Sequence, residues 1–431
     1  MPNTALIQSM SAAHEIIWLN PGRQPYHAAM QSATLTVADI DAAEARLLRF
    51  APLIAHYFPE TQDAHGIIES PLTEIPAMAD LLRSKGAALP GRLFLKRDSD
   101  LPVAGSVKAR GGIYEVLKHS EELALAAGLI SGPDDEYLKL ATPEARAFFA
   151  AHKMQVGSTG NLGMSIGIMS AALGYEAIVH MSADAKQWKK DKLRSHGVTV
   201  IEYEGDYGEA VANGRRQSDA DPQSYFVDDE NSTDLFFGYA VAGRRLKAQL
   251  DAAGIVVDAA HPLFAYLPCG VGGAPGGIAF GLRTVFGDAA HCFFIEPTQA
   301  PCMTLGLVTG KQNAICVQDI GLTGQTQADG LAVGRPSGFI GRTIAPHLSG
   351  CLTVDDSRLN PYLQDLYRTE QLFIEPSSCA AFIGPEKLLA SEAGQQYLQE
   401  NKINPANILH LAWATGGRLV PQEIRAELLN S

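Results

Sequence analysis

Short apolar segments alternate with longer segments of helical periodicity over most of this chain of 431 residues. An apolar segment bounded by turn signals is typical of a buried strand. The clearest such segments are 93–98, 153–156, 177–181, 198–203, 224–227, 263–267, 292–295, 372–374 and 408–412. Parallel strands need a crossover between them, usually a helix, so this alternation predicts an α/β fold. We expect twisted, mostly parallel sheets flanked by helices, with ligands beyond the carboxyl ends of the strands.

Residues 1–85 and 233–252 depart from this alternation. The first segment is expected to be mostly helical, and the second to form a single long helix. Residues 301–350 are rich in Gly, Thr and Asp and predict a long, loop-rich region, which in a compact domain is usually functional. The chain length predicts two or three domains.

The charge balance excludes some partners. The chain carries 34 Lys and Arg against 47 Asp and Glu, a formal net charge of -13. Nucleic acids and anionic membranes would repel such a protein, so neither is an expected partner. No apolar run approaches the length of about 20 residues that a bilayer-spanning helix needs. The amino-terminal residues lack the pattern of a signal peptide, and we expect a soluble, cytoplasmic protein.

The six cysteines do not form a metal-binding pattern. They lie at 269, 292, 302, 316, 351 and 379, with no CxxC pair and no His/Cys cluster at zinc spacing. Scattered buried thiols in a reducing cytoplasm are the expected interpretation.

A glycine-rich segment, residues 269–277, follows the apolar strand at 263–267 and opens a helix. Its glycines let backbone N–H groups approach an anion, and the helix amino terminus adds a favourable dipole. The glycines are Gly270, Gly272, Gly273, Gly276 and Gly277. This pattern favours a phosphate cradle over a turn that binds nothing.

The identity of the phosphate ligand stays open at this level. The GxxxxGK[ST] motif of nucleoside triphosphate loops is absent. The GxGxxG motif of dinucleotide-binding folds is only partly met, although Glu296 closes the next strand, near where a ribose-binding acid would lie. An NAD-linked dehydrogenase is therefore an alternative, but it gives no role to the segments described next.

Lys108 lies among small residues in the segment 106–112, SVKARGG. Such surroundings leave room for another group to come close to the amine. The alternative is a helix that ends here, with basic residues near its carboxyl terminus and a glycine stop. Ser106 is the expected N-cap of a helix that carries Lys108.

Two further segments follow predicted strands. Ser158, Thr159 and Gly160 precede Asn161 at the start of a helix, and this nest of donors suits a carboxylate. Asn161 has an amide that can donate to a ring oxygen. Thr415 follows the last strand, where its hydroxyl can bond a heterocyclic nitrogen. Each of these segments is also compatible with an ordinary turn.

Taken together, these segments resemble the fold-type II pyridoxal phosphate enzymes, the tryptophan synthase β-like group, and within it the D-serine dehydratases. The resemblance covers nearly the whole chain. Val107 and Ala274 are conservative variations. The matching segments are 18–21, 105–112, 157–163, 268–277, 329–335 and 412–417.

The resemblance implies a role for each segment around pyridoxal 5'-phosphate. Lys108 would be the Schiff-base lysine and the catalytic residue. Asn161 would contact the pyridine 3-hydroxyl and Thr415 the pyridine nitrogen, while the glycines of 270–277 would hold the phosphate. Ser158, Thr159 and Gly160 would hold the substrate carboxylate. Glu296 and Cys302 resemble the ligand region of a monovalent cation, potassium or sodium.

The resemblance further implies β-elimination of D-serine to pyruvate and ammonia by a monomer. L-serine/L-threonine dehydratases of the same fold are the near alternative. A larger cofactor-binding domain would comprise 1–111 and 241–431, and a smaller domain 112–240. The cofactor would lie in the cleft between them.

Overall fold

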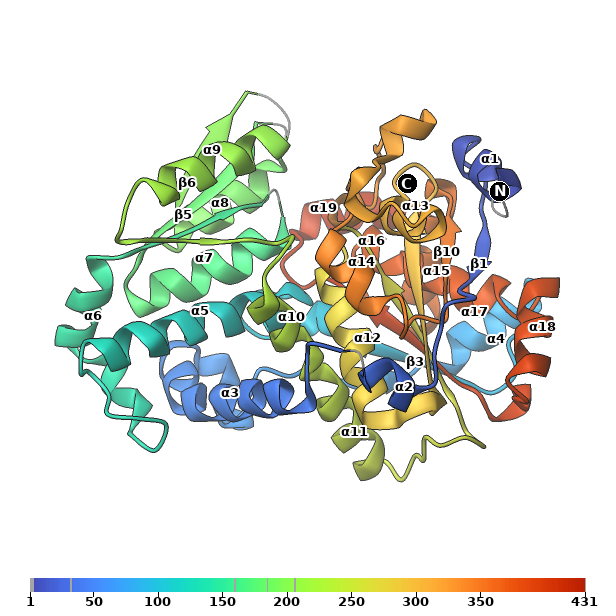
Figure 1. Ribbon diagram of the computed structural model, residues 1–431, viewed down its shortest axis with the longest axis horizontal. Coiled ribbons are helices and arrows are strands. Elements are labelled where there is room, and N and C mark those ends of the chain that lie inside the picture. Colours follow the sequence, from blue (N-terminus) through green and yellow to red (C-terminus); the bar gives the residue numbers. More distant parts are fainter. Residues whose placement is uncertain (1–3, 32, 159, 184, 205–206, 431) are drawn as a thin grey trace. The chain divides into compact units, whose positions relative to one another are not determined.

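The computed structural model describes residues 4–31, 33–158, 160–183, 185–204 and 207–430 (Figure 1). The chain divides into two compact units, each considered separately below. The first unit comprises Met1–Val37, Ser70–Asp100 and Tyr239–Ser431, and the second comprises Ala38–Glu69 and Leu101–Gly238. The domain division expected from the sequence stays a prediction.

The first unit contains a mixed sheet in the order β1-β10-β9-β8-β11-β3-β2. The pairs β1–β10 and β2–β3 are antiparallel, and the other neighbours are parallel. Every residue of β8, β9 and β11 is buried, which explains their continuous apolar runs, since a parallel sheet is covered on both faces. The strands are β1 (Ile17–Leu19), β2 (Leu72–Glu74), β3 (Arg92–Arg97), β8 (Leu263–Pro268), β9 (Ala290–Pro297), β10 (Gly350–Val354) and β11 (Leu409–Ala414).

Helices of the first unit cover this sheet, and a large apolar core cluster packs side chains of α4, α15 and α17 against its strands. The helices are α1 (Thr4–Ser11), α2 (Tyr26–Gln31), α4 (Pro76–Ser84), α11 (Ala242–Ala252), α12 (Gly273–Phe286), α13 (Cys302–Thr309), α14 (Gly338–Ile344), α15 (Leu359–Glu370), α16 (Pro376–Cys379), α17 (Ile383–Lys387), α18 (Glu392–Glu400) and α19 (Gln422–Asn430).

The second unit contains a parallel sheet in the order β6-β5-β4-β7. Its strands are β4 (Lys153–Gly157), β5 (Glu176–Ser182), β6 (Thr199–Tyr203) and β7 (Ser224–Val227). Its helices are α3 (Val37–Tyr57), α5 (Lys108–Ala126), α6 (Pro143–Ala150), α7 (Asn161–Leu173), α8 (Gln187–Ser195), α9 (Tyr207–Asp219) and α10 (Thr233–Ala240). Figure 1 shows the green strands β5 and β6 beside α7, α8 and α9.

The expected α/β class with mostly parallel sheets is confirmed, whereas some elements differ. Residues 372–374 form no strand, and the helix expected over 233–252 is interrupted at Val241. The strands β1 and β2 lie in the segment expected to be helical, and β10 begins at the last residue of the region expected to be loop. These strands are short, so pairing with neighbouring strands, rather than their own composition, determines that they adopt the β conformation. Among the described residues, no helix is both long and apolar enough to cross a membrane.

Candidate active site

The glycine-rich loop lies at the carboxyl end of β8, and α12 begins within it at Gly273. Gly272 has φ of +113°, and a Cβ there would lie 2.4 Å from Met303 Cε. A Cβ on Gly270 would lie 3.0 Å from the carbonyl oxygen of Gly330. The first amides of a helix have no acceptor within the helix, so they are available to an anion at this end of α12. The loop therefore needs glycine for its own conformation, and its helix-start amides point to an anion site.

Thr415 directly follows β11, the neighbour of β8, and so lies at the same edge of the first unit's sheet as the glycine loop. Ser378 Oγ accepts hydrogen bonds from the backbone N–H groups of Thr415 at 2.8 Å and Gly416 at 2.9 Å. The same oxygen lies 3.1 Å from Thr415 Oγ1. Ser378, which the sequence did not indicate, thus fixes the Thr415 hydroxyl beyond the strand end.

Lys108 is the first residue of α5 in the second unit, and Val107 is the N-cap. The alternative of a helix ending at Lys108 is therefore wrong. The expected N-cap at Ser106 is also wrong, because its hydroxyl accepts no hydrogen bond from α5. In the described part of the chain, Ser106 Oγ is buried without a hydrogen-bond partner. A buried hydroxyl beside Lys108 is thereby left for a group that the protein itself does not supply.

Arg110, in the first turn of α5, has a charge partner. Its side chain is nearly buried, and its guanidinium donates two hydrogen bonds to the Glu69 carboxylate, at 2.5 and 3.1 Å. Such a forked pair compensates both charges. Arg110 therefore does not act as a helix-end cation. Because Glu69 neutralises its charge, Arg110 repels a positive charge on the Lys108 amine less strongly.

Asn161 is the first residue of α7, again at the carboxyl end of a strand, β4. The N–H of Gly160 donates to Ser158 Oγ at 3.2 Å, which forms a local turn before the helix. Thr159 lies outside the described residues. α7 packs on α5 so closely that a Cβ on Gly112 would lie 2.2 Å from Ser165 Oγ.

Asp229 approaches the Lys108 amine, with its Oδ1 3.8 Å from Lys108 Nζ. This Oδ1 is buried, and within the described residues it has no hydrogen bond. Asp229 belongs to residues 228–232, which join β7 to α10 and which we call the β7–α10 loop. No motif marks this acid in the sequence, because it lies 121 positions from Lys108.

Glu296 and Cys302 lie together at the amino end of α13 in the first unit. The Glu296 carboxylate accepts hydrogen bonds from the backbone N–H groups of Met303 and Thr304, both at 2.8 Å. Complete burial raises the pKa of Glu296 to about 7. The Cys302 thiol donates to the carbonyl oxygen of Gly270 at 3.5 Å. No group of three or more His, Cys, Asp or Glu side chains suited to a metal occurs in the described ranges.

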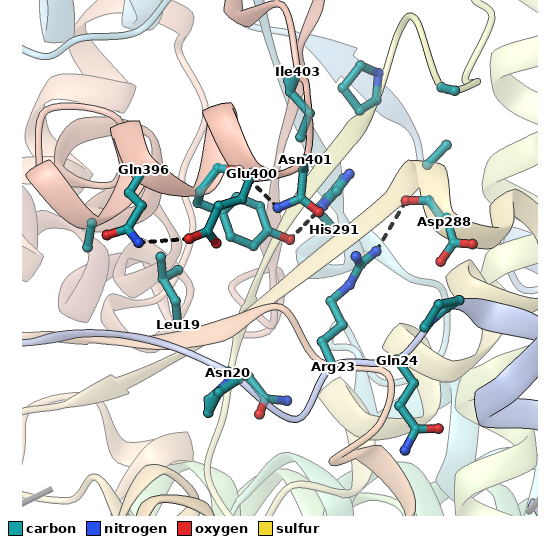
Figure 2. Close-up of a pocket in the computed structure, with 17 residues that line it drawn as sticks. Leu19, Asn20, Arg23, Gln24, Asp288, His291, Gln396, Glu400, Asn401 and Ile403 are labelled. Atoms are coloured by element: carbon teal, nitrogen blue, oxygen red, sulfur yellow. Dashed lines mark hydrogen bonds between the residues drawn. The ribbon is translucent and has the colours of Figure 1, made fainter. Parts of the chain in front are cut away.

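A separate pocket of about 730 Å³ lies at the other edge of the first unit's sheet, among residues that precede or begin β8 and β9. Figure 2 shows Arg23 extending toward Asp288, whose backbone oxygen accepts a hydrogen bond from Nη2 at 3.1 Å. His291 Nδ1 lies 2.7 Å from the Tyr397 hydroxyl. None of the predicted site residues lines this pocket, which argues against it as the cofactor site.

Comparisons with known proteins agree with this geometry. The family described as pyridoxal-phosphate dependent enzyme matches residues 64–397. The chain is 57% identical over 420 residues to a probable D-serine dehydratase of Chromobacterium violaceum, covering 96% of this chain and 93% of the relative. It is 56% identical over 432 residues to a probable D-serine dehydratase of Fusobacterium nucleatum, covering 100% and 98%.

Solved structures agree on the fold. Diaminopropionate ammonia lyase from Escherichia coli in complex with D-serine superposes with a TM-score of 0.72 at 15% identity, covering 96% of both chains. The matched residues include Lys108, the turn before α7 that ends at Asn161, and the glycine loop. This chain belongs to the pyridoxal-phosphate-dependent enzymes.

Proposed function

We propose that this enzyme is a D-serine dehydratase, which converts D-serine to pyruvate and ammonia. The observation that carries the proposal is 54–58% identity, over nearly the whole chain, to relatives named probable D-serine dehydratase. A structural neighbour whose complex contains D-serine supports the same substrate class.

The residues present fit the cofactor. A Cβ would lie 3.0 Å from a protein atom at Gly270 and 2.4 Å from one at Gly272, so the loop stays free of side chains, as expected where backbone amides meet a phosphate. Ser106 Oγ beside Lys108 is buried without a partner in the residues that the structure describes. Lys108 would attach the cofactor through Nζ, and the glycine loop would hold its phosphate. Asn161 would donate to its ring oxygen and Thr415 would face its ring nitrogen.

When bound, pyridoxal 5'-phosphate supplies an electron sink that acidifies the α-proton of an attached amino acid. Lys108 Nζ is the proposed general base for that proton. Ser158, Thr159 and Gly160 would bind and orient the substrate carboxylate. Thr415 is neutral, and a neutral partner leaves the ring nitrogen largely unprotonated, which moderates the sink and favours loss of the β-hydroxyl.

The finer proposals follow the family resemblance. A monovalent cation would bind near Glu296 and Cys302, where carbonyl oxygens such as that of Gly270 supply suitable ligands. The protein would act as a cytoplasmic monomer, with the cofactor between a domain of 1–111 plus 241–431 and a domain of 112–240.

A direct experiment combines colour with product. The purified protein with pyridoxal phosphate should absorb visible light and release pyruvate from D-serine, and borohydride should abolish both. Peptide mapping should then find the reduced cofactor on Lys108. A colourless protein, or a coloured one that forms a 2-oxo acid only from L-serine or L-threonine, would contradict the proposal.

A further inference from the structure

Glu115 is a buried carboxyl group on α5, two turns beyond Lys108, with a relative exposure of 1%. Its Oε1 accepts a hydrogen bond from the Tyr225 hydroxyl at 2.9 Å, and its Oε2 accepts one from Ser232 Oγ. Tyr225 lies on β7, and Ser232 is the last residue of the β7–α10 loop. One side chain of α5 thus holds both the strand before this loop and the end of the loop itself.

Ser232 in turn organises the loop. Its backbone N–H donates to the carbonyl oxygen of Asp228 at 3.0 Å, which closes the loop on itself. Its Oγ accepts from the N–H of Leu235 at 3.0 Å, which caps the start of α10. Asp229 lies inside this closed turn, with its carboxylate 3.8 Å from Lys108 Nζ. The position of Asp229 therefore depends on the anchor at Ser232.

We propose that Glu115 is a positioning residue for the reaction, because it anchors through Tyr225 and Ser232 the loop that brings Asp229 to Lys108. The inference rests on the proposed function, and it extends that function to a residue outside the cofactor and substrate contacts. Asp229 would provide a carboxylate that keeps the lysine amine oriented toward the substrate.

The charged and titratable groups around Glu115 lie on α5 and α10, with the Tyr225 hydroxyl on β7. On α10, Asp234 accepts hydrogen bonds from Lys118 Nζ at 2.8 Å, and its negative charge contributes to raising the pKa of Glu115. On α5, His119 stacks on the Tyr225 ring at 4.0 Å, and burial lowers its pKa to about 4. Burial raises the pKa of Glu115 to about 7, while its two hydroxyl donors act in the opposite direction.

The ionised and protonated forms of Glu115 differ in what they can accept. The carboxylate accepts the hydrogens of both hydroxyls, as the observed geometry requires. Protonation places a hydrogen on one carboxyl oxygen, so the hydroxyl that donates to this oxygen must rotate to accept that hydrogen, and its own hydrogen then loses the carboxyl acceptor. We therefore expect the loop to loosen, and the rate to fall, as the pH decreases through about 7.

The main test replaces Glu115 with Gln, which keeps the shape but cannot ionise. For E115Q we expect kcat on D-serine at pH 8.5 to fall about tenfold, the effect of losing one hydrogen bond to a charged group. The decrease in rate at low pH, with its apparent pKa near 7 in the wild type, should be absent. The matched control is E122Q, which neutralises a glutamate of the same helix whose side chain is 58% exposed. E122Q should behave as the wild type.

A second variant keeps the inference testable if E115Q does not fold. Y225F deletes one donor to the carboxylate, which raises the pKa of Glu115 and should move the low-pH decrease to higher pH. An unchanged pH profile in both E115Q and Y225F would overturn the proposal.

A further measurement does not depend on turnover. At pH 8.5, where Glu115 is ionised, hydrogen exchange of amides 228–235 in the cofactor-free protein should be faster in E115Q than in the wild type or E122Q, since the anchor of Ser232 is weakened. If wild-type protein formed no pyruvate from D-serine, the proposed function would fail, while the exchange rates would still report on the anchor. Unchanged exchange in E115Q would contradict the anchoring role.

Discussion

The glycine loop in the first unit and the surroundings of Lys108 in the second are built in different ways. The loop presents only backbone groups. Gly272 has a left-handed conformation, and a side chain at Gly270 or Gly272 would collide with neighbouring protein atoms. Around Lys108, side chains from distant segments meet, with Glu69 on Arg110 and Asp229 near the lysine amine. A phosphate can be bound by fixed backbone dipoles, whereas an amine that moves protons needs groups that can titrate or reorient.

The largest expected effect concerns the lysine itself. Replacing Lys108 with Ala removes the attachment point and the proposed base, so kcat should fall by about 10²–10⁴-fold or more, and the visible absorption of the bound cofactor should be lost. Steady-state pyruvate formation and an absorption spectrum check both. A K108A protein that keeps its colour and its rate would show that the reactive amine lies elsewhere.

The next effect tests the glycine loop, whose function depends on its backbone conformation. In G272A the new Cβ would clash with Met303 in a left-handed conformation, which should cost about 1–3 kcal/mol of strain and weaken cofactor binding. The affinity is measured by titrating the cofactor-free protein with pyridoxal phosphate. Gly287 is a matched control, since it also has positive φ, at +56°, but nothing lies within 4 Å of its Cβ position. Equal losses of cofactor affinity in G272A and G287A would mean that strain alone, and not the cradle, matters.

A third effect concerns how the free energy of unfolding depends on pH through Glu115, on the same helix as Lys108. The pKa of Glu115 is raised by burial to about 7, so ionising it in the folded state is unfavourable. Its contribution to stability is fully present below its ordinary pKa and is lost as the pH rises through about 7. The free energy of global unfolding of E115Q should therefore match that of the wild type at pH 4 and exceed it by up to about 3 kcal/mol at pH 8.5. This global gain is separate from the local loosening of the β7–α10 loop, in which residue 115 stays buried and only its hydrogen bonds to Tyr225 and Ser232 are weakened. Urea unfolding at several pH values measures the difference, and a constant offset across pH would contradict the account.

The smallest expected effect is at the Thr415 turn. S378A leaves two backbone N–H groups without their acceptor, which should cost about 1–3 kcal/mol of unfolding free energy. The Thr415 hydroxyl should then be less well oriented, so the absorption maximum of the bound cofactor should shift. An unchanged spectrum and melting temperature would show that the turn does not depend on Ser378.

The same contrast explains how much could be predicted from the sequence. β8 and β11 are fully buried apolar runs, and the glycines after β8 are required by local conformation, so both leave a strong local pattern. The sequence places the start of α5 one residue early, because Ser106 is a good N-cap type but its hydroxyl bonds no amide of α5. Local propensity is overridden where a side chain serves a site.

Contacts between distant segments left no such pattern. β1 pairs with β10 through residues more than 300 positions apart, and Asp229 reaches Lys108 from a loop that resembles any polar turn. Glu115 lies in a helix whose periodicity does not distinguish a buried acid from an exposed one. The family resemblance supplied roles for the cofactor contacts, but it did not reveal the side chains that position them.

The central claim is that this chain uses pyridoxal phosphate to eliminate water and ammonia from D-serine. The most direct measurement compares kcat/KM for pyruvate formation from D-serine and L-serine by the same preparation of cofactor-loaded enzyme. The account predicts a ratio of about ten or more in favour of D-serine, which corresponds to at least about 1.4 kcal/mol of transition-state discrimination. A ratio near or below one, or no pyruvate from D-serine, would contradict it.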